Sequence, residues 1–450
     1  QKDAQVRAVA SGTLSNGETV VINSDGTVSS VDPAGQSYPQ SIGTPVEFET
    51  GAAYYQRAAY DAANNKVVIT YRDVNNSNYG TAIVGDVSGN SITFGTAVVF
   101  QSAEQYAPMP TVYDSSNEKI VVFFNNTSLQ PTAKVGTVSG TSISFGSATS
   151  FDTSVFIYSQ ASAAFDSTNN KVVTAYYKSG SASAAIVGTV SGTSISFGSP
   201  TTYYAGAGNN SEMGFDSSAG KVVIAFEEGN SSLGAIVGTV SGTAISFGTK
   251  TTISSNTCRT SAVNYVPNAN KTVITFHDVD GGSSKGKAVV GTISGTSISF
   301  GTIASFGNSG GAFTSIAAPI TNDAIAVAYA DADNSSYGTF VVGTVSGTSI
   351  SFNTKTAFNA AASNNYWGAA YDSNLGKVVF AYGDSSGKAV VAQTAYDGTD
   401  ADKFIGFSDG VYANGQSAVI NTTCSVDRNQ TGLTAGQKYY VQTDGSLGLT

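Results

Sequence analysis

Aromatic side chains accompanied by arginines gather in short segments of the sequence that could bind sugars. An aromatic ring stacks on the apolar C–H face of a sugar, and short polar groups hydrogen-bond to its hydroxyls. The candidate ligand-binding residues are Tyr54, Tyr55, Arg57, Arg72, Tyr106, Tyr158, His277, Tyr366 and Trp367. Tyr366 and Trp367, the only tryptophan, form the strongest pair because they adjoin in an Asn-rich segment. With 23 Tyr and 23 Phe in the chain, most other aromatics are expected to fill a core.

Acidic residues recur seven residues after the start of a repeated KVVIAY-like segment, at Asp73, Glu228, Asp278, Asp331 and Asp384. A ring of carboxylates would suit Ca²⁺, which prefers oxygen ligands. The weak candidates for such a metal site are Asp278, Asp280, Asp331 and Asp333. Their segments lack the spacing and the terminal glutamate of an EF-hand loop. The preferred interpretation is that each recurring carboxylate accepts the amides of its own turn.

Catalysis has little support in the sequence. The chain has one histidine, His277, so a Ser-His-Asp arrangement has at most one possible centre. Glycoside hydrolysis would need two carboxylates from separate repeats to converge. The possible pairs combine Glu227 or Glu228 with Asp73 or Asp278. A sialidase-like site would also need an arginine cluster, and the chain has five arginines. We therefore predict that the protein is not an enzyme.

Composition limits the classes of protein that these residues can belong to. The chain has 450 residues, of which 12% are charged, against roughly 25% in an ordinary globular protein. The net charge of −10 argues against a nucleic-acid surface, which needs clustered lysines and arginines. No apolar run approaches the roughly 18 residues of a membrane span. The two cysteines, Cys258 and Cys424, show no framework spacing and are interpreted as free small hydrophobes.

A repeat near 50 residues dominates the organisation of the chain. The phrase VGTVSGTSISFG recurs with its first glycine at Gly85, Gly136, Gly188, Gly238, Gly291 and Gly343. A second phrase of the form YDSSNNKVVIAY precedes each copy and occurs a seventh time near the end of the array. Each unit is predicted to contain four short antiparallel strands, because β-branched and aromatic residues alternate with polar ones between turn residues.

Seven four-stranded units predict a seven-bladed β-propeller over residues 41–394, with an open β-solenoid as the alternative. The first propeller segment, GTPVEFE at 43–49, matches the fourth strand of a unit, whereas the seventh unit lacks that strand. We therefore expect the N-terminal strand to complete the last blade by pairing with residues 388–394. The two ends of the chain, 1–40 and 395–450, carry similar SGTLSNGETVVINSDG and TGLTAGQKYYVQTDG patterns. They are predicted to form one small β-domain that anchors or oligomerises the protein.

The variable segments of the repeats should lie together on one face of the propeller. The turns between the first and second strands and between the third and fourth strands barely vary, whereas the other two sets of connections differ widely between units. Variable loops on a rigid scaffold are where recognition usually takes place. The candidate residues above fall in or beside these connections, as do Tyr79, Tyr204, Glu212 and Glu227.

The repeat phrase, together with the C-terminal FIGFSDGVYANGQSAVI and GLTAGQKYYVQTDGSLG, resembles repeat-bearing virion structural and tail-fibre-like proteins of marine bacteriophages, cyanophages among them. The resemblance covers the repeats at 43–394 and most of the end module. It implies an oligomeric appendage on the virion surface, in contact with other virion proteins. It transfers no catalytic motif and no attachment residues.

Three functions are consistent with the sequence. The first is a phage fibre or decoration protein whose propeller binds a host-surface glycan or protein. The second is a secreted bacterial lectin or adhesin with the same ring. The third is a polysaccharide hydrolase or lyase with its site at the propeller axis. The first two predict a location on the virion surface or outside the cell, without insertion into a membrane and without nucleic acid as a partner.

Overall fold

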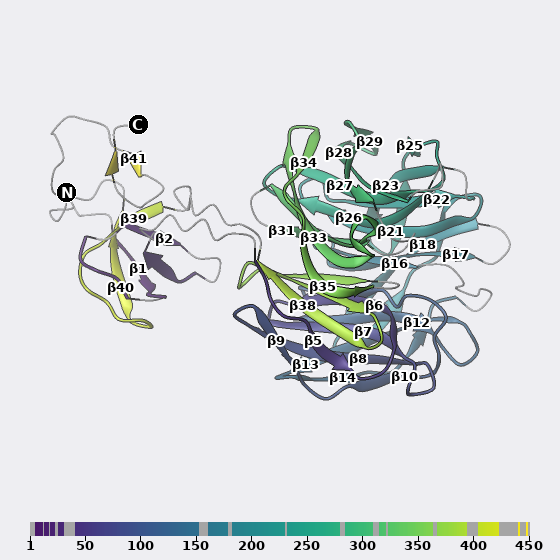
Figure 1. The fold of residues 1–450 in the computed structure, drawn as a ribbon, viewed down its shortest axis with the longest axis horizontal. Helices are drawn as coiled ribbons and strands as arrows, with labels where there is room; N and C mark the ends of the chain where they lie inside the picture. The colour runs from purple at the N-terminus through teal and green to yellow at the C-terminus, as the bar shows by residue number, and fades with distance from the viewer. Residues whose placement is uncertain are drawn as a thin grey trace. The chain divides into compact units, whose positions relative to one another are not determined.

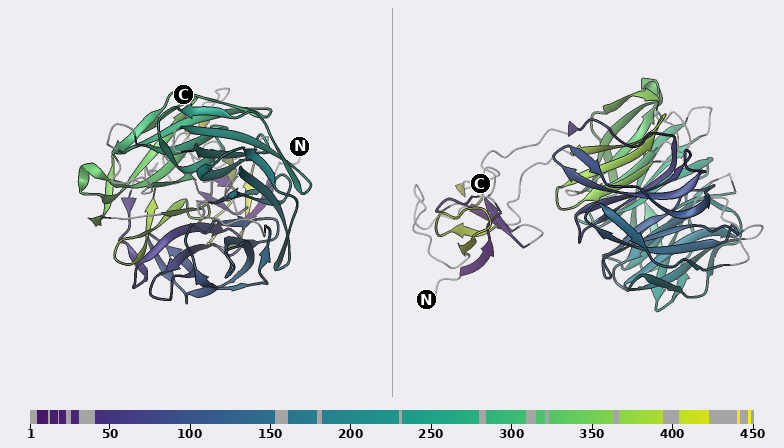
Figure 2. Two further views of the ribbon diagram at one scale, coloured as in Figure 1. Left: turned by 90° about the vertical axis from the view of Figure 1, so that its right-hand side faces the viewer. Right: turned by 90° about the horizontal axis from the view of Figure 1, so that it is seen from below.

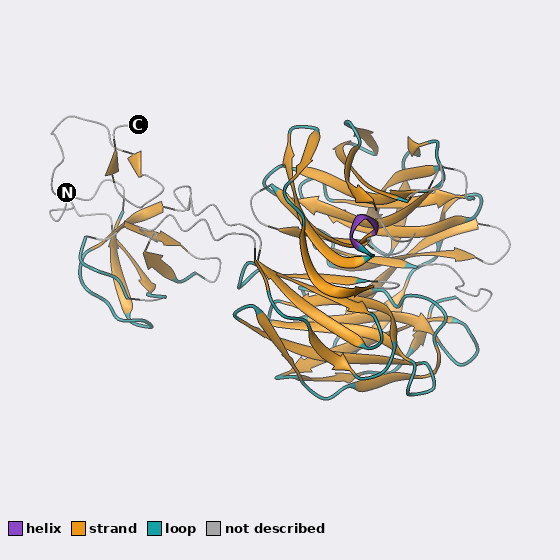
Figure 3. Cartoon of the chain, viewed as in Figure 1, coloured by secondary structure: helices purple, strands orange, loops and turns teal. Residues whose placement is uncertain are grey.

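The computed structural model describes residues 5–11, 13–17, 19–22, 26–30, 41–152, 161–178, 182–229, 232–279, 284–308, 315–320, 323–362, 367–393, 404–422, 440–441 and 447–448. The chain forms two compact units, one from residues 1–41 with 394–450 and one from residues 42–393. Figure 1 labels the strands of both units. Nearly all described secondary structure is β-strand, and the short 3-10 turn η2 (Ala332–Asn334) is drawn in purple in Figure 3.

Residues 42–393 form a seven-bladed β-propeller, as the sequence predicts. The inner strands of the seven blades are β6 (Ala53–Asp61), β11 (Thr111–Asp114), β16 (Ser162–Asp166), β21 (Gly208–Asp216), β26 (Cys258–Val266), β31 (Ser315–Ile320) and β36 (Gly368–Asp372). The second strands are β7 (Lys66–Asp73), β12 (Lys119–Asn125), β17 (Lys171–Lys178), β22 (Lys221–Glu228), β27 (Lys271–Asp278), β32 (Ala324–Asp331) and β37 (Lys377–Gly383). The third strands are β8 (Tyr79–Ser88), β13 (Pro131–Ser139), β18 (Ala182–Ser191), β23 (Leu233–Ser241), β28 (Lys285–Ser294), β33 (Tyr337–Ser346) and β38 (Gly387–Gln393).

The outer strand of each blade is broken into two segments that pair with the same third strand. The first segments are β9 (Ser91–Phe94), β14 (Ser142–Phe145), β19 (Ser194–Phe197), β24 (Ala244–Phe247), β29 (Ser297–Phe300), β34 (Ser349–Phe352) and, in blade 7, β4 (Ser41–Ile42). The second segments are β10 (Val98–Glu104), β15 (Thr149–Ser150), β20 (Thr201–Tyr204), β25 (Thr251–Ser254), β30 (Ala304–Asn308), β35 (Thr356–Ala362) and, in blade 7, β5 (Val46–Glu49).

The ring closes as predicted, with a strand from the start of the propeller completing the last blade. Val46 and Glu47 of β5 lie opposite Ala389 and Lys388 of β38. Consecutive inner strands contact one another, and β36 of blade 7 contacts β6 of blade 1. In the left view of Figure 2 the blades follow one another around the ring in chain order. Closure leaves no open edge between the first and last blades.

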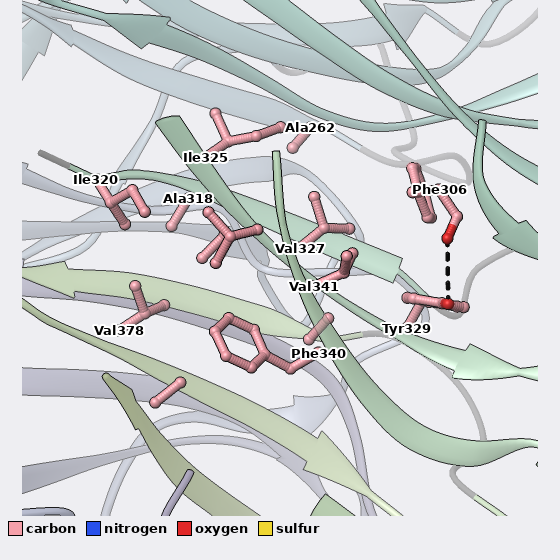
Figure 4. Close-up of a cluster of buried hydrophobic side chains, with 14 of the residues drawn as sticks. Ala262, Phe306, Ala318, Ile320, Ile325, Val327, Tyr329, Phe340, Val341 and Val378 are labelled. Carbon is pink, nitrogen blue, oxygen red and sulfur yellow. Dashed lines mark hydrogen bonds between the residues drawn. The ribbon is translucent and has the colours of Figure 1, made fainter. Parts of the chain in front are cut away.

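The second strands are apolar on both faces because each blade is packed between two neighbours. Val67 and Ile69 of β7 pack with residues of blade 7, whereas Val68 packs with residues of blade 2. Figure 4 shows the equivalent core where blades 5, 6 and 7 meet, with Tyr329 donating a hydrogen bond from its hydroxyl to the carbonyl oxygen of Phe306 at 3.2 Å. A sheet that is buried on both faces requires a continuous apolar run in place of strict alternation.

The turns between first and second strands are closed by the predicted aspartates. In each case Oδ1 accepts hydrogen bonds from the backbone amides two and three residues later, and these aspartates are Asp61, Asp114, Asp166, Asp216 and Asp372. The turns between third and outer strands contain a glycine in the left-handed region, such as Gly140 with φ of 58°. Both turn types lie at the same end of the antiparallel blades, so the variable connections share the other end.

The unit built from the chain ends contains a five-stranded sheet in the order β1-β40-β39-β2-β3. Its strands are β1 (Gln5–Val9), β2 (Thr19–Ile22), β3 (Val28–Ser30), β39 (Phe404–Ser408) and β40 (Ser417–Asn421), and the pair β41 (Tyr440–Val441) and β42 (Leu447–Gly448) is separate. Leu14, Val20 and Ile420 form part of its core. Both ends of the chain thus contribute strands to one sheet, which is the small β-domain that the sequence predicts.

Candidate functional site

The inner strands enclose a cavity of about 160 Å³ at the axis of the propeller. Small or apolar side chains such as Ala58, Ala163 and Ala369 make up most of its lining, and its charged lining residues are Arg57 and Glu212. Arg57 lies on β6 of blade 1 and Glu212 on β21 of blade 4. Counted back from the aspartate that ends each strand, the two occupy the same position, so both side chains enter the axis at one level.

Arg57 and Glu212 form an ion pair across the axis. Nη2 of Arg57 lies 2.9 Å from Oε1 of Glu212, and each side chain is 14% exposed. Nη1 of Arg57 also donates to the carbonyl oxygen of Trp367 at 3.3 Å, which ties blade 7 to the same group. Burial raises the pKa of Glu212 to about 7, although the guanidinium opposes this shift. The two charges satisfy each other, so this pair joins three blades and presents little charge to a ligand.

A second group of candidate residues comes together at the variable end of blades 1 and 2. We call Tyr54, Tyr55, Arg72, Glu104 and Tyr106 the tyrosine–arginine cluster. The guanidinium carbon of Arg72 lies 4.9 Å from the ring centroid of Tyr54 and 5.0 Å from that of Tyr55. Both rings are half-buried, and Tyr106 is 44% exposed. The sequence named four of these five residues, and the structure brings them to one place.

Gln105 fixes the loop of the cluster to both blades. Nη1 of Arg72 donates to the carbonyl oxygen of Gln105 at 3.2 Å. The buried amide of Gln105 donates to the carbonyl oxygen of Asn125 in blade 2 at 3.0 Å, and its Oε1 accepts from the amide of Asn125 at 3.2 Å. On the exposed side of this loop, the hydroxyl of Tyr106 donates to Oε2 of Glu104 at 2.8 Å. Two anchored tyrosines, an arginine and an exposed Tyr–Glu pair therefore share one surface.

A bulge in β6 sets the direction of Tyr55. The register between β6 and β7 shifts between Tyr54 and Arg57, and Tyr55 has φ of 60°. A left-handed backbone is unfavourable for a bulky residue and is held by the surrounding structure. Blade 4 has a bulge at the corresponding place, where Asn210 has φ of 47°. Residues held in such backbone conformations cluster at active sites and ligand clamps.

The structure gives other candidates a packing role. Trp367 was predicted to bind a ligand, but it is 1% exposed and its ring packs against Phe358 and Tyr382 at 5.9 and 5.6 Å. His277 is also fully buried, and burial lowers its pKa to about 4. Trp367 lies directly before β36 and packs against blade 6, whereas His277 lies on β27 and its ring packs against Phe306 of its own blade. Tyr158 and Tyr366 lie outside the described residues.

Four of the five recurring acidic residues form ion pairs with lysines of their own blade. Glu228 pairs with Lys250, Asp278 with Lys287, Asp331 with Lys355 and Asp384 with Lys388. Asp73 accepts a hydrogen bond from the amide of Asn76 in its own turn at 3.1 Å.

The metal candidates show the same arrangement. Lys355 lies 3.5 Å from Asp333 as well as 3.1 Å from Asp331, so an ammonium group occupies the place between these carboxylates. Within the described ranges, no group of three or more His, Cys, Asp or Glu side chains could hold a metal ion. Asp280 lies outside those ranges.

The carboxylates considered for hydrolysis belong to separate environments. Glu228 and Asp278 have lysine partners, whereas Glu227 is fully buried, accepts a hydrogen bond from Asn210 and lies 3.9 Å from Arg259. The lining of the axial cavity includes the carboxylate of Glu212 but neither Glu227 nor Glu228. The convergence at the axis that was considered for Glu227 or Glu228 is therefore not formed in the described structure.

Sequence reasoning missed Glu104 and Gln105. The segment FQSAEQYAPM was recognised as a variable connection, but nothing in it marks Gln105 as the residue that joins two blades. The pairing of Arg57 with Glu212 had a weak signal. The corresponding residues in blades 2, 3, 5 and 7 are Pro110, Ser162, Ala262 and Gly368, so two charges at this position are exceptional.

No protein-family model matches the chain, and no curated protein sequence does. Solved structures share its fold. BP39L lectin from Burkholderia pseudomallei matches with a TM-score of 0.56 at 11% identity, over 77% of this chain and 98% of that one. A mutant of Aleuria aurantia lectin in complex with Fucα1-6GlcNAc matches with a TM-score of 0.42 at 12% identity, over 68% and 96% of the two chains. NanB sialidase from Streptococcus pneumoniae matches with a TM-score of 0.46 at 12% identity, over 78% and 70%.

At 11% identity the similarity to BP39L lectin establishes a shared propeller fold. The other two similarities are too distant to support an argument. In the part of the chain that the structure describes, no helix is long and apolar enough to cross a membrane.

Proposed function

We propose that this protein is a non-catalytic carbohydrate-binding propeller, a lectin or adhesin that takes a glycan at the tyrosine–arginine cluster. The observation that carries the proposal is the packing of one guanidinium against two half-buried tyrosines beside an exposed Tyr–Glu pair. Aromatic rings supply stacking surfaces for sugar C–H groups, and Glu104 and Arg72 supply an acceptor and donors for hydroxyls. A propeller of the same fold is a lectin in Burkholderia pseudomallei, which supports this proposal.

Binding to a glycan array tests the proposal. Tyr106→Ala and Tyr55→Ala should each lower binding at least tenfold, because each removes a stacking surface. Tyr265→Ala is the matched control, since Tyr265 is a tyrosine at the opposite end of its blade whose hydroxyl bonds Asn270 in a turn. The control should bind like the unaltered protein. Equal loss in all three variants, or no loss in any, would contradict the assignment of the site.

Two locations are compatible with this function. A secreted lectin or adhesin is the form that we favour, because the structure that shares the fold is a lectin. A place on a phage particle, implied by the sequence resemblance, is the second form, and it adds other virion proteins and further copies of the chain as partners. Electron microscopy of the purified assembly distinguishes the two. On a particle, the tyrosine–arginine cluster must point outward for host attachment to be its role.

A hydrolase or lyase is the second candidate function. It is favoured by Glu212, whose pKa of about 7 in an axial cavity suits a general acid. The cavity lining offers no second carboxylate beside it in the described residues, and Arg57 occupies one of its oxygens. Incubation of the protein with each bound glycan decides between the two. Release of reducing ends that stops in Glu212→Gln would establish catalysis, and intact glycan would support simple binding.

A further inference from the structure

Among the residues that the structure describes, Arg72 differs from the other arginines of the propeller in having no carboxylate partner. Arg57 pairs with Glu212, and Arg259 lies 3.9 Å from Glu227. Among the described residues, Arg72 makes no ion pair and donates one hydrogen bond, from Nη1 to the carbonyl oxygen of Gln105. A half-buried guanidinium without a counter-charge is unfavourable, because burial removes the water that would otherwise solvate it. Such a group is stabilised when an anion binds to it.

The neighbouring carboxylates do not supply this counter-charge. Asp73 follows Arg72 on β7, so its side chain points to the other face of the blade. There it is buried and accepts the amide of Asn76. Glu104 accepts the hydroxyl of Tyr106 on the exposed side of the loop.

The guanidinium is held in a fixed orientation with one edge unused. Tyr54 and Tyr55 pack against it, and Gln105 accepts from Nη1. The buried Nε has no hydrogen-bond partner in the described structure. Nε and Nη2 together form the edge with which arginine binds a carboxylate through two parallel hydrogen bonds. Nη2 is the nitrogen of this edge that is not buried, so a carboxylate that binds there would supply the missing counter-charge.

We propose that the tyrosine–arginine cluster selects acidic sugars, with Arg72 binding the carboxylate of a uronic acid residue. The sugar ring lies against the tyrosines, and Glu104 accepts one of its hydroxyls. This inference rests on the proposed function and names the class of ligand for the same site. A neutral sugar would leave the guanidinium without its counter-charge.

An array that carries uronate-containing glycans, their methyl esters, sulfated glycans and neutral glycans of matched chain length tests this selectivity. The protein should bind uronate members, and methyl esterification should weaken binding by roughly tenfold or more, since it removes a charge-assisted hydrogen bond. Arg72→Met should lose the preference for uronates, because it keeps an unbranched side chain beside the tyrosines and removes the charge. Arg72→Lys should retain part of it. Higher salt should weaken uronate binding through screening.

Lys285→Met is the matched control for charge. Lys285 is an exposed lysine at the start of β28, at the same end of the blades, so its loss removes one positive charge without touching the cluster. It should leave uronate binding unchanged. Equal binding of esters and acids, preference for sulfated or neutral glycans, or an equal effect of both Met variants would overturn the inference. Neutral binding that Tyr106→Ala abolishes would leave the proposed function standing, whereas an array with no bound member would reject both.

Discussion

Single buried ionisable residues give the propeller opposing responses to pH. Glu212 and His277 are both removed from water, and burial favours the neutral form of each. For the glutamate this raises the pKa, and for the histidine it lowers the pKa. The two groups therefore affect stability in overlapping ranges of pH with opposite sign.

For Glu212, the pKa rises from 4.5 to about 7 on folding. The folded state therefore holds a proton that the unfolded state releases, so the stabilisation is complete below pH 4.5 and is lost as the pH rises to about 7. The loss amounts to about 3 kcal/mol. Urea denaturation across this range should show that decline in the unaltered protein relative to Glu212→Gln. Parallel curves for the two proteins would mean that Glu212 titrates normally.

For His277, the pKa falls from 6.5 to about 4 on folding. The unfolded state takes up a proton that the folded state refuses, so the stabilisation is complete above pH 6.5 and is lost as the pH falls to about 4. The loss is again about 3 kcal/mol. Relative to His277→Gln, the unaltered protein should lose stability on acidification in the same denaturation experiment. A difference between the two proteins that does not change with pH would refute this.

At the scale of elements, a glycine in the outer strand of six of the seven blades allows neighbouring blades to approach. A Cβ at Gly146, directly after β14, would lie 2.0 Å from the carbonyl oxygen of Thr193 in the next blade. The same contact occurs at Gly43, Gly95, Gly198, Gly248 and Gly301. In blade 6 the equivalent residue is Asn353. The outer strand of blade 7 comes from the N-terminal segment, so no turn joins it to β38 and a side chain at residue 353 meets no such carbonyl oxygen. Contact between blades thus explains why a glycine follows the SISF-like segment in most of the repeats.

This contact predicts different losses of stability for alanine substitutions at the same repeat position in two blades. Gly146→Ala should destabilise the propeller by roughly 1–3 kcal/mol or more, because the obstructing atom is backbone and the blades must separate to admit the methyl group. Asn353→Ala should destabilise the propeller less, because it adds no atom at the interface. Its cost is the loss of the hydrogen bond that Asn353 Oδ1 accepts from the amide of Val342 at 2.9 Å. Thermal denaturation of both variants checks the order. A more stable Gly146→Ala variant would show that this interface has room.

At the scale of the whole molecule, the short segment β4–β5 closes the ring. Phe48 of β5 packs against Tyr71 and Phe94 of blade 1 at 5.1 and 5.6 Å, so this segment links the last blade to the first. The propeller unit begins at residue 42 and ends at residue 393. The ring therefore depends on a strand that is made more than 300 residues before the blade it completes.

Two fragments test the closure. A chain of residues 42–393 should fold into a ring, because it lacks only Ser41 of β4 and keeps all of β5, the two segments that form the outer strand of blade 7. A chain of residues 50–393 should melt at a lower temperature, since it loses β4, β5 and the packing of Phe48. The cost should exceed the roughly 3–5 kcal/mol of removing one buried aromatic side chain. Similar melting temperatures for the two fragments would mean that blade 7 is complete without the N-terminal strand.

The sequence by itself determined the number of blades, the order of their strands and the closure of the ring. These features follow from local signals that repeat, namely the turn aspartates, the turn glycines and the apolar runs, and their period identifies each unit. Only the tertiary structure decided which side chains meet. Arg57 and Glu212 are 155 residues apart, and Trp367 is covered by a neighbouring blade, so neither contact follows from spacing within a repeat. That no described carboxylate pairs with Arg72 depends on the same packing, because a counter-charge is defined by proximity in space.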